Sequence, residues 1–172
     1  MDSIENREDG ILRLSVEKWH QLALEGTDLP MVTALNGYSM EPLIRYKKDL
    51  VTIVPGNRKL LLGDIVLFKK KDGVFVVHRL YRILDDGKNV QTWGDNCYHP
   101  DPVIDTASIW GIAVSVEKKG IQHFLDTDHQ RQKGLNWIKS KHRRHVWFTY
   151  RRTLQRVRDF KNSILRMEKG IV

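Results

Sequence analysis

The chain has 172 residues, with 41% hydrophobic and 29% charged side chains, which is typical of one globular domain with a hydrophobic core. Cys97 is its only cysteine, which excludes an internal disulfide. No apolar run approaches the roughly 20 residues of a membrane-spanning helix, and the polar segment 1–10 lacks the pattern of a secretory signal peptide. These features favour a cytoplasmic protein, or one held peripherally at the inner face of the membrane.

The net charge of +8 is unevenly distributed. Residues 1–128 contain 16 Lys and Arg against 19 Asp and Glu, whereas residues 129–172 contain 13 against 2. We therefore expect two parts: a nearly neutral body, 1–128, and a basic tail, 129–172, with a task of its own.

The body is expected to begin with a short helix. Residues 15–25 carry Ser15 as a capping residue, apolar side chains at steps of three and four, and Gly26 as a stop. The segment 31–37 alternates like a strand, and 39–44 is expected to form a turn or a single helical turn, since Pro42 is tolerated in a first turn.

From 50 to 118 the pattern is that of short β-strands. The strands are separated by turns at Lys71-Asp72-Gly73, Asp86-Gly87 and Lys119-Gly120. We therefore predict a mainly β fold, a small curled antiparallel sheet or barrel, with the short N-terminal helix before it and a long basic helix after it.

The tail is expected to be helical. Apolar residues at 146, 150, 154, 157, 160, 164 and 167 form one stripe at helical spacing, and Lys and Arg fill the other faces. A break near Gly134 would separate a shorter preceding helix or a loop. The stripe either packs on the body or docks on an anionic membrane surface. A nucleic-acid partner is not expected, because the tail contains no recognisable motif for it.

Four segments of the body, in fixed order, carry chemistry. They read GYSMEP at 37–42, GDIVLF at 63–68, VVHRL at 76–80 and GDNCYHPD at 94–101. Each is a weak signal alone, but together they supply what a serine hydrolase needs. A serine hydroxyl requires a base, histidine is the usual one, a carboxylate orients it, and backbone N–H groups stabilise the oxyanion.

The residue types in the four segments define the expected roles. Ser39 is the candidate nucleophile, His78 the base and Asp101 the orienting carboxylate, with Asp95 as its competitor. The site-shaping residues are expected to be Gly37, Met40, Pro42, Gly94 and Asp95. The alternatives are a helix-capping Ser39, a His78 with only a structural role, and His99 as the base. Cys97 is expected to be inert.

The order and the residues of the four segments resemble the motifs of the signal peptidase I family. This family belongs to a broader clan that includes the self-cleaving repressors of the SOS response. Ser-Met-x-Pro at 39–42 matches the nucleophile box, and Gly-Asp-Ile-Val at 63–66 the following strand. His78-Arg79 resembles the histidine-type base of endoplasmic-reticulum and archaeal enzymes. Gly-Asp-Asn at 94–96, with Asp101 six residues after Asp95, matches the last box. The resemblance covers about residues 30–118.

The resemblance implies a serine endopeptidase that cleaves a leader or signal segment of a precursor protein, without a metal or organic cofactor. Its substrate would be an extended peptide with small side chains before the cut. The chain departs from the family in lacking a membrane anchor and in carrying Trp93 where a basic residue is common, so small unanchored bacterial forms look closest. The alternative is a non-catalytic module that binds peptides or membrane surfaces.

Overall fold

The computed structural model describes residues 15–169, without the side chains at 141–144, 158, 162–163 and 165–169. Two compact units make up the chain, residues 1–135 and residues 136–172. The polar segment 1–10 and the side chain of Met167, both used in the sequence analysis, lie outside the described residues. The first unit contains the whole β-sheet and every residue expected to form the site.

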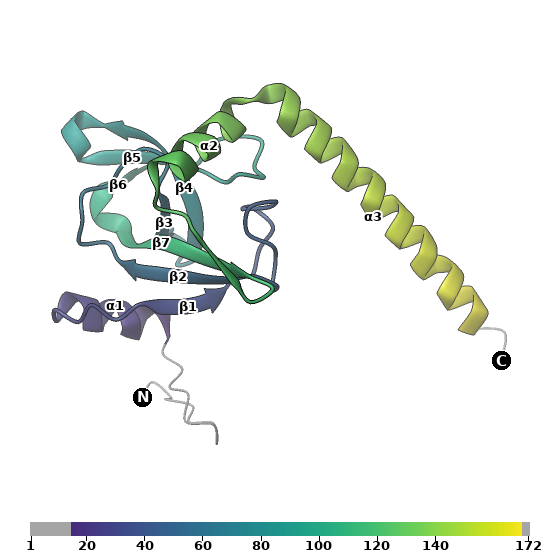
Figure 1. Ribbon diagram of the computed structural model, residues 1–172, viewed down its shortest axis with the longest axis horizontal. Coiled ribbons are helices and arrows are strands. Elements are labelled where there is room, and N and C mark those ends of the chain that lie inside the picture. Colours follow the sequence, from purple (N-terminus) through teal and green to yellow (C-terminus); the bar gives the residue numbers. More distant parts are fainter. Residues whose placement is uncertain (1–14, 170–172) are drawn as a thin grey trace, which may run out of the picture. The chain divides into compact units, whose positions relative to one another are not determined.

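An eight-stranded antiparallel sheet makes up most of the first unit (Figure 1). Seven strands follow the order β1-β2-β7-β3-β4-β5-β6, and β8 pairs with β7. Among the described strands this path does not close, so the mainly antiparallel prediction is confirmed in the form of a sheet rather than a barrel. The strands are β1 Met31–Ala34, β2 Leu50–Pro55, β3 Ile65–Lys69, β4 Phe75–Leu84, β5 Asn89–Trp93, β6 Val103–Asp105, β7 Ile109–Lys118 and β8 Ile121–Phe124.

Tight turns join neighbouring strands where the sequence predicted them. Gly73, with a φ of +85°, donates its N–H to the Lys70 carbonyl between β3 and β4. Lys119 and Gly120 both have positive φ between β7 and β8, a conformation that matches the twist of a hairpin. The sequence analysis did not predict the short strand β6, because the prolines on either side of Asp101 are typical of a loop.

Two buried clusters hold the sheet together. The first includes Trp19 from helix α1 (Val16–Leu24), and Met40 and Ile44 from the turn after β1, packed on strands β2, β3, β4 and β7. The second lies among β3, β4, β5 and β7 and consists of Val66, Phe68, Leu80, Val90, Ile109 and Ile112. Burial of each large apolar side chain contributes roughly 1.5–3 kcal/mol. The first cluster matters for the site, because it anchors the turn that carries Ser39.

Helix α1 lies beside β1 and β2 (Figure 1). Its predicted cap is confirmed, since the Ser15 hydroxyl accepts a hydrogen bond from the Lys18 N–H at 3.2 Å. The Trp19 indole donates to the Leu29 carbonyl at 2.8 Å. The His20 ring stacks on Trp110, with centroids 4.0 Å apart. These contacts fix the helix against the sheet.

A buried arginine connects the sheet to helix α2 (Asp128–Lys139). The Arg79 guanidinium forms two 2.8 Å hydrogen bonds with Asp95 and one of 2.8 Å with the Gly63 carbonyl. A Cβ on Gly134 would lie 2.0 Å from the Arg79 guanidinium carbon. The predicted helix break near Gly134 is therefore wrong: α2 continues through this glycine, which makes room for Arg79, and the helices separate at Ser140.

The second unit consists of the end of α2 and helix α3 (Lys141–Lys169). The predicted long helix is confirmed, and the described members of its apolar stripe are exposed by 36% to 69%. Across the part of the chain that the structure describes, no helix combines the length and the apolar character needed to cross a membrane.

Replacing Gly134 by alanine is expected to destabilise the first unit, although alanine usually stabilises a helix interior by roughly 1 kcal/mol over glycine. The new methyl group would displace a guanidinium that Asp95 and Gly63 hold in place, so the free energy of unfolding should fall by about 1–3 kcal/mol. Urea unfolding measures this change. Lys133→Ala, exposed at the preceding position, is the matched control, with an expected change within about 0.5 kcal/mol. Equal or greater stability of Gly134→Ala would contradict the packing argument.

Candidate active site

Ser39 lies in the compact turn between β1 and β2. The Glu41 N–H donates to the Tyr38 carbonyl at 3.2 Å, and the Ile44 N–H donates to the Met40 carbonyl at 2.9 Å. Met40 and Ile44 are fully buried in the core. These two apolar anchors fix the turn and leave Ser39 half-buried at the surface.

Two residues that the sequence analysis treats as site-shaping lie in the same segment. The peptide bond between Glu41 and Pro42 is cis. A Cβ on Gly37 would meet no neighbouring atom within 4 Å, and its φ is not in the left-handed region. Neither backbone conformation nor crowding therefore requires glycine at 37, and the space beside it is open.

His78 projects from β4, opposite Val66 of β3. Its side chain is only 6% exposed, and its ring meets Phe68 edge to face at 6.3 Å between centroids. The interior position of β4 in the sheet, between β3 and β5, fixes the backbone that carries the imidazole.

Asp101 lies in the loop between β5 and β6, and β5 fixes it from three directions. Its N–H donates to the Thr92 carbonyl at 2.8 Å, and its own carbonyl accepts from the Gln91 amide at 2.9 Å. The Thr92 hydroxyl donates to the Asp101 Oδ2 at 2.7 Å. The same oxygen lies 2.6 Å from His78 Nδ1. Asp101 therefore lies against His78, the contact that the sequence analysis expected.

This contact fixes the tautomer of His78. Burial raises the pKa of Asp101, but hydrogen bonds and charge from His78, the Thr92 hydroxyl and the Lys70 charge outweigh it and lower this pKa. The carboxylate is thus ionised and only accepts hydrogen bonds, so His78 Nδ1 must carry a proton. The other ring nitrogen, Nε2, is the atom that can exchange a proton with a neighbour.

Gly94 marks the place where the turn that carries Ser39 approaches His78. An ideal Cβ on Gly94 would lie 2.9 Å from His78 Nε2, 2.9 Å from the Ser39 carbonyl oxygen and 2.6 Å from Cys97 Sγ. Each of these three atoms lies within 2.9 Å of the same Cβ position, so any two of them are at most twice that distance apart. Any side chain at 94 would push them apart, which gives Gly94 a physical reason for its place.

The loop after Gly94 is tied directly to the nucleophile turn. The Asn96 N–H donates to the Ser39 carbonyl at 2.7 Å, and the Asn96 side-chain amide donates to the Tyr38 carbonyl at 2.8 Å. The Cys97 N–H donates back to the Gly94 carbonyl at 2.9 Å. Sequence reasoning missed Asn96, although Asn after Gly-Asp is a common turn former that satisfies nearby backbone groups.

Asp95 does not compete with Asp101 for the histidine. Its side chain is 3% exposed and forms the bidentate pair with Arg79. This pair joins the residue after His78 to the residue after Gly94, and so holds the base strand against the loop.

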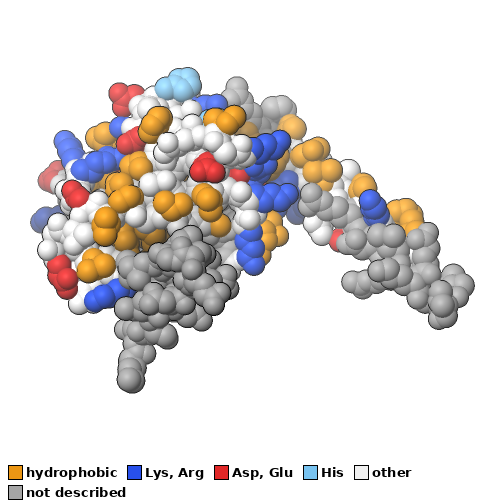
Figure 2. All heavy atoms as spheres, turned by 60° about the horizontal axis from the view of Figure 1, so that its bottom comes forward, with side chains coloured by type: hydrophobic (Ala, Val, Ile, Leu, Met, Phe, Trp, Pro, Cys, Tyr) orange, Lys and Arg blue, Asp and Glu red, His pale blue; other side chains and the backbone are white. Residues whose placement is uncertain are grey.

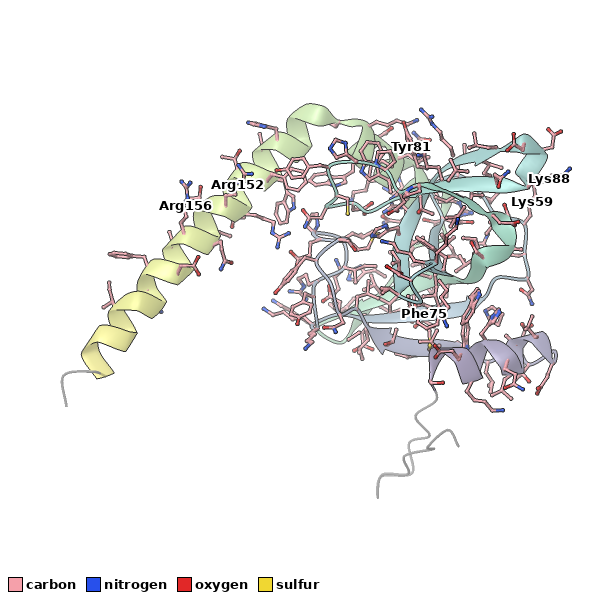
Figure 3. The ribbon with its side chains drawn as sticks, turned by 180° about the vertical axis from the view of Figure 1, so that it is seen from behind. Lys59, Phe75, Tyr81, Lys88, Arg152 and Arg156 are labelled. Atoms are coloured by element: carbon pink, nitrogen blue, oxygen red, sulfur yellow. The ribbon has the colours of Figure 1, made fainter. Side chains whose placement is uncertain are left out.

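The candidate residues share one cleft of about 590 Å³ in the first unit. Ser39, His78, Cys97 and Asp101 line it together with Gly37. Its walls are otherwise mostly apolar and come from α1, β1, β2, β3 and β4, through residues such as Val16, Met31, Ile53, Leu67 and Phe75. The labelled Phe75 side chain marks this region in Figure 3.

Cys97 is closer to the chemistry than the sequence analysis expected. Burial lowers the pKa of His78, but hydrogen bonds and charge from Asp101 and Cys97 outweigh it and raise this pKa to about 9. Among the described residues, no hydrogen bond joins the Ser39 hydroxyl to His78. The imidazole thus faces two candidate nucleophiles. The signal for Cys97 was its position three residues after Gly94 in a tight turn.

No group of three His, Cys, Asp or Glu side chains in the described part of the chain is arranged to hold a metal ion. His99, the alternative base, is exposed. In comparisons with protein-family models, with curated proteins and with solved structures, none matches this chain. The functional argument therefore depends on the geometry of the cleft.

NMR titration of the histidine rings is expected to separate the buried imidazole of His78 from the partly buried imidazole of His20. His78 should titrate at about 9, whereas burial lowers the pKa of His20 below its usual 6.5. Asp101→Asn and Cys97→Ala should each lower the pKa of His78 and leave His20 unchanged. A His78 pKa at or below 6.5 in the parent protein would contradict the geometry.

The raised pKa of His78 also has a consequence for stability. A histidine with a folded pKa above its unfolded value of 6.5 stabilises the folded state fully below pH 6.5. This contribution to the free energy of unfolding is lost as the pH rises through about 9. His78 thus adds a few kcal/mol to the free energy of unfolding at neutral pH, at about 1.4 kcal/mol for each unit of pKa difference.

Proposed function

We propose that the protein is a serine endopeptidase with the site and the sheet type of signal peptidase-like enzymes. Ser39 is the nucleophile, His78 the general base and Asp101 the residue that orients the base. The observation that carries the proposal is the 2.6 Å contact between His78 Nδ1 and Asp101 Oδ2. It leaves Nε2 on the side of the ring near Ser39, in a cleft that both residues line.

The reaction divides into two acyl transfers. The Ser39 oxygen attacks the scissile carbonyl while His78 Nε2 takes the hydroxyl proton, and the same proton then passes to the leaving amine. An acyl-enzyme remains on Ser39. Water attacks it with His78 again as the base, which releases the acid and restores the serine. The ionised Asp101 stabilises the imidazolium formed in both steps.

Backbone donors for the oxyanion are present beside the nucleophile. Within residues 15–169, no hydrogen bond occupies the N–H groups of Ser39 or Met40. Such donors stabilise the charge that develops in the tetrahedral intermediate. Open space at Gly37 would allow the substrate to approach them.

The substrate we propose is an extended segment of a precursor protein. Strand β1 ends the sheet, so its outer edge has no strand partner among the described residues. Met31, Thr33 and Leu35 in and after β1 line the cleft that contains Ser39. A peptide added along this edge would form main-chain hydrogen bonds and lead its scissile bond toward the serine.

A second candidate function is a peptide-binding module without catalysis. The missing hydrogen bond between Ser39 and His78 favours it, although catalytic contacts often form only with substrate bound. Both candidates use the same cleft and edge strand, so binding alone does not separate them.

Ser39→Ala is expected to abolish cleavage, by at least about a thousandfold in kcat/KM, because it removes the hydroxyl proposed to attack the scissile carbonyl. The free energy of unfolding should change by less than about 0.5 kcal/mol, because no hydrogen bond from the hydroxyl to a described residue is lost. The assay is mass spectrometry of a library of extended peptides, together with labelling by a serine-directed acylating probe.

Ser108→Ala is the matched control, since this serine lies outside the cleft and bonds the Asp105 carbonyl. It should retain full activity and the probe adduct on Ser39. Peptide binding without cleavage or adduct in the parent protein would select the non-catalytic module instead.

The pH dependence of kcat/KM is expected to follow the base. His78 must be neutral to accept a proton, so kcat/KM should rise with pH through about 9. Cys97→Ala removes one cause of the raised pKa, so it should shift this rise to lower pH and increase kcat/KM at pH 7. Asp101→Asn should instead reduce kcat by up to roughly 10⁴-fold at every pH, because the imidazole loses its orientation.

Two results would contradict the roles proposed for Ser39 and Cys97. A Cys97→Ala variant that is inactive at all pH values, beside an active Ser39→Ala variant, would transfer that role to the thiol. A pH profile that Cys97→Ala leaves unchanged would show that Cys97 does not act on the base.

A further inference from the structure

Helix α3 exposes a continuous apolar stripe, which the candidate active site does not use. At 100° per residue, its described members fall within about 120° of the helix circumference. Their exposed fractions run from 36% for Leu154 to 69% for Phe160. The stripe consists of Val146, Tyr150, Leu154, Val157, Phe160 and Ile164.

The flanks of this stripe are positively charged. Arg151 falls on one side, and Arg152 and Arg156 project together from the other (Figure 3). Lys161 lies within the stripe, close to one edge, and is exposed. Orange apolar side chains recur along the visible part of α3, with blue basic side chains among them (Figure 2). Residues 141–169 contain ten Lys and Arg against two acidic residues.

Aromatic rings lie at the start of the stripe. Trp147 meets Tyr150 with ring centroids 5.9 Å apart, and it meets Trp137 of the same unit at 6.5 Å. Tryptophan and tyrosine are enriched at the boundary between lipid and water, where an apolar ring with a polar edge is accommodated.

We propose that α3 docks in the plane of an anionic lipid bilayer, with its apolar stripe facing the acyl chains. The helix of 29 residues is about 40 Å long and has no apolar segment that could span a membrane. An in-plane helix instead needs one apolar face and a basic polar face, which α3 has. Lys161 can extend its ammonium from the stripe to the headgroups, since its stem is apolar.

The charges favour a bilayer over the two other partners of such a helix. Asp159 is the only acidic residue among the side chains that the structure describes in α3, and Gln155 donates to it at 2.9 Å. A coiled coil of two copies would place arginines of both helices along one seam without acidic partners. A nucleic acid would neutralise the arginines but leave six apolar side chains in water. An anionic bilayer satisfies both faces together.

Co-sedimentation of the full chain with vesicles tests the proposal independently of any peptidase activity. We expect binding to vesicles with one part in three of phosphatidylglycerol, at least about tenfold tighter than to pure phosphatidylcholine, and weaker binding as salt increases. Joint replacement of Arg152 and Arg156 by glutamine should weaken binding by roughly 30-fold, at about fivefold for each arginine.

A pair of variants with equal charge separates the apolar stripe from general electrostatics. Val157→Asp places a carboxylate in the stripe, and Gln155→Asp places one on the opposite face of the same helix. Val157→Asp should abolish binding, whereas Gln155→Asp should weaken it only by about fivefold. Circular dichroism confirms that both variants keep the helix.

Three results would overturn the proposal. The first is no sedimentation with anionic vesicles, and the second is equal loss of binding in the two aspartate variants. The third is a stripe-dependent dimer, or tight binding to duplex DNA, in a chain that ignores vesicles. Sedimentation velocity measures the dimer, and a DNA titration of the same preparation measures binding to duplex DNA.

Discussion

The hydrogen bond between His78 and Asp101 is the interaction on which the site depends. At 2.6 Å, and with a second hydrogen bond from the Thr92 hydroxyl to the same oxygen, it keeps the carboxylate ionised and the proton on Nδ1. Nε2 is thereby directed toward the turn that carries Ser39. If the carboxylate moved away, the buried ring would lose the charge that keeps its pKa high, and either tautomer would become possible.

Buried packing around this hydrogen bond makes the arrangement rigid. The Arg79–Asp95 pair lies one residue beyond His78 and one beyond Gly94, so it holds the two strands that supply the base and the loop. A buried ion pair is stable only when its remaining donors are satisfied, and the Gly63 carbonyl satisfies one of them. Gly134 leaves the space that the guanidinium occupies, which connects helix α2 to the same network.

The two units follow different physical rules. The first is nearly neutral, and its stability comes from two apolar clusters on a sheet whose strands are far apart in the sequence. The second is a basic helix whose apolar side chains remain in water. The proposed peptide cleft and the proposed membrane-docking helix lie in different units, and each proposal is tested without the other.

The sequence by itself determined the local features: the capped helix at α1, the turns at Gly73 and Gly120, and the stripe of α3, because these depend on neighbours within a few residues. It also selected Ser39, His78 and Asp101 as candidates, which line one cleft in the structure. It did not predict β6, the continuous α2 or the contact of Cys97 with His78. Only the tertiary structure decided that Asp101 meets the histidine while Asp95 meets Arg79. Neither local sequence specifies a partner for its aspartate, and contacts with distant strands choose between them.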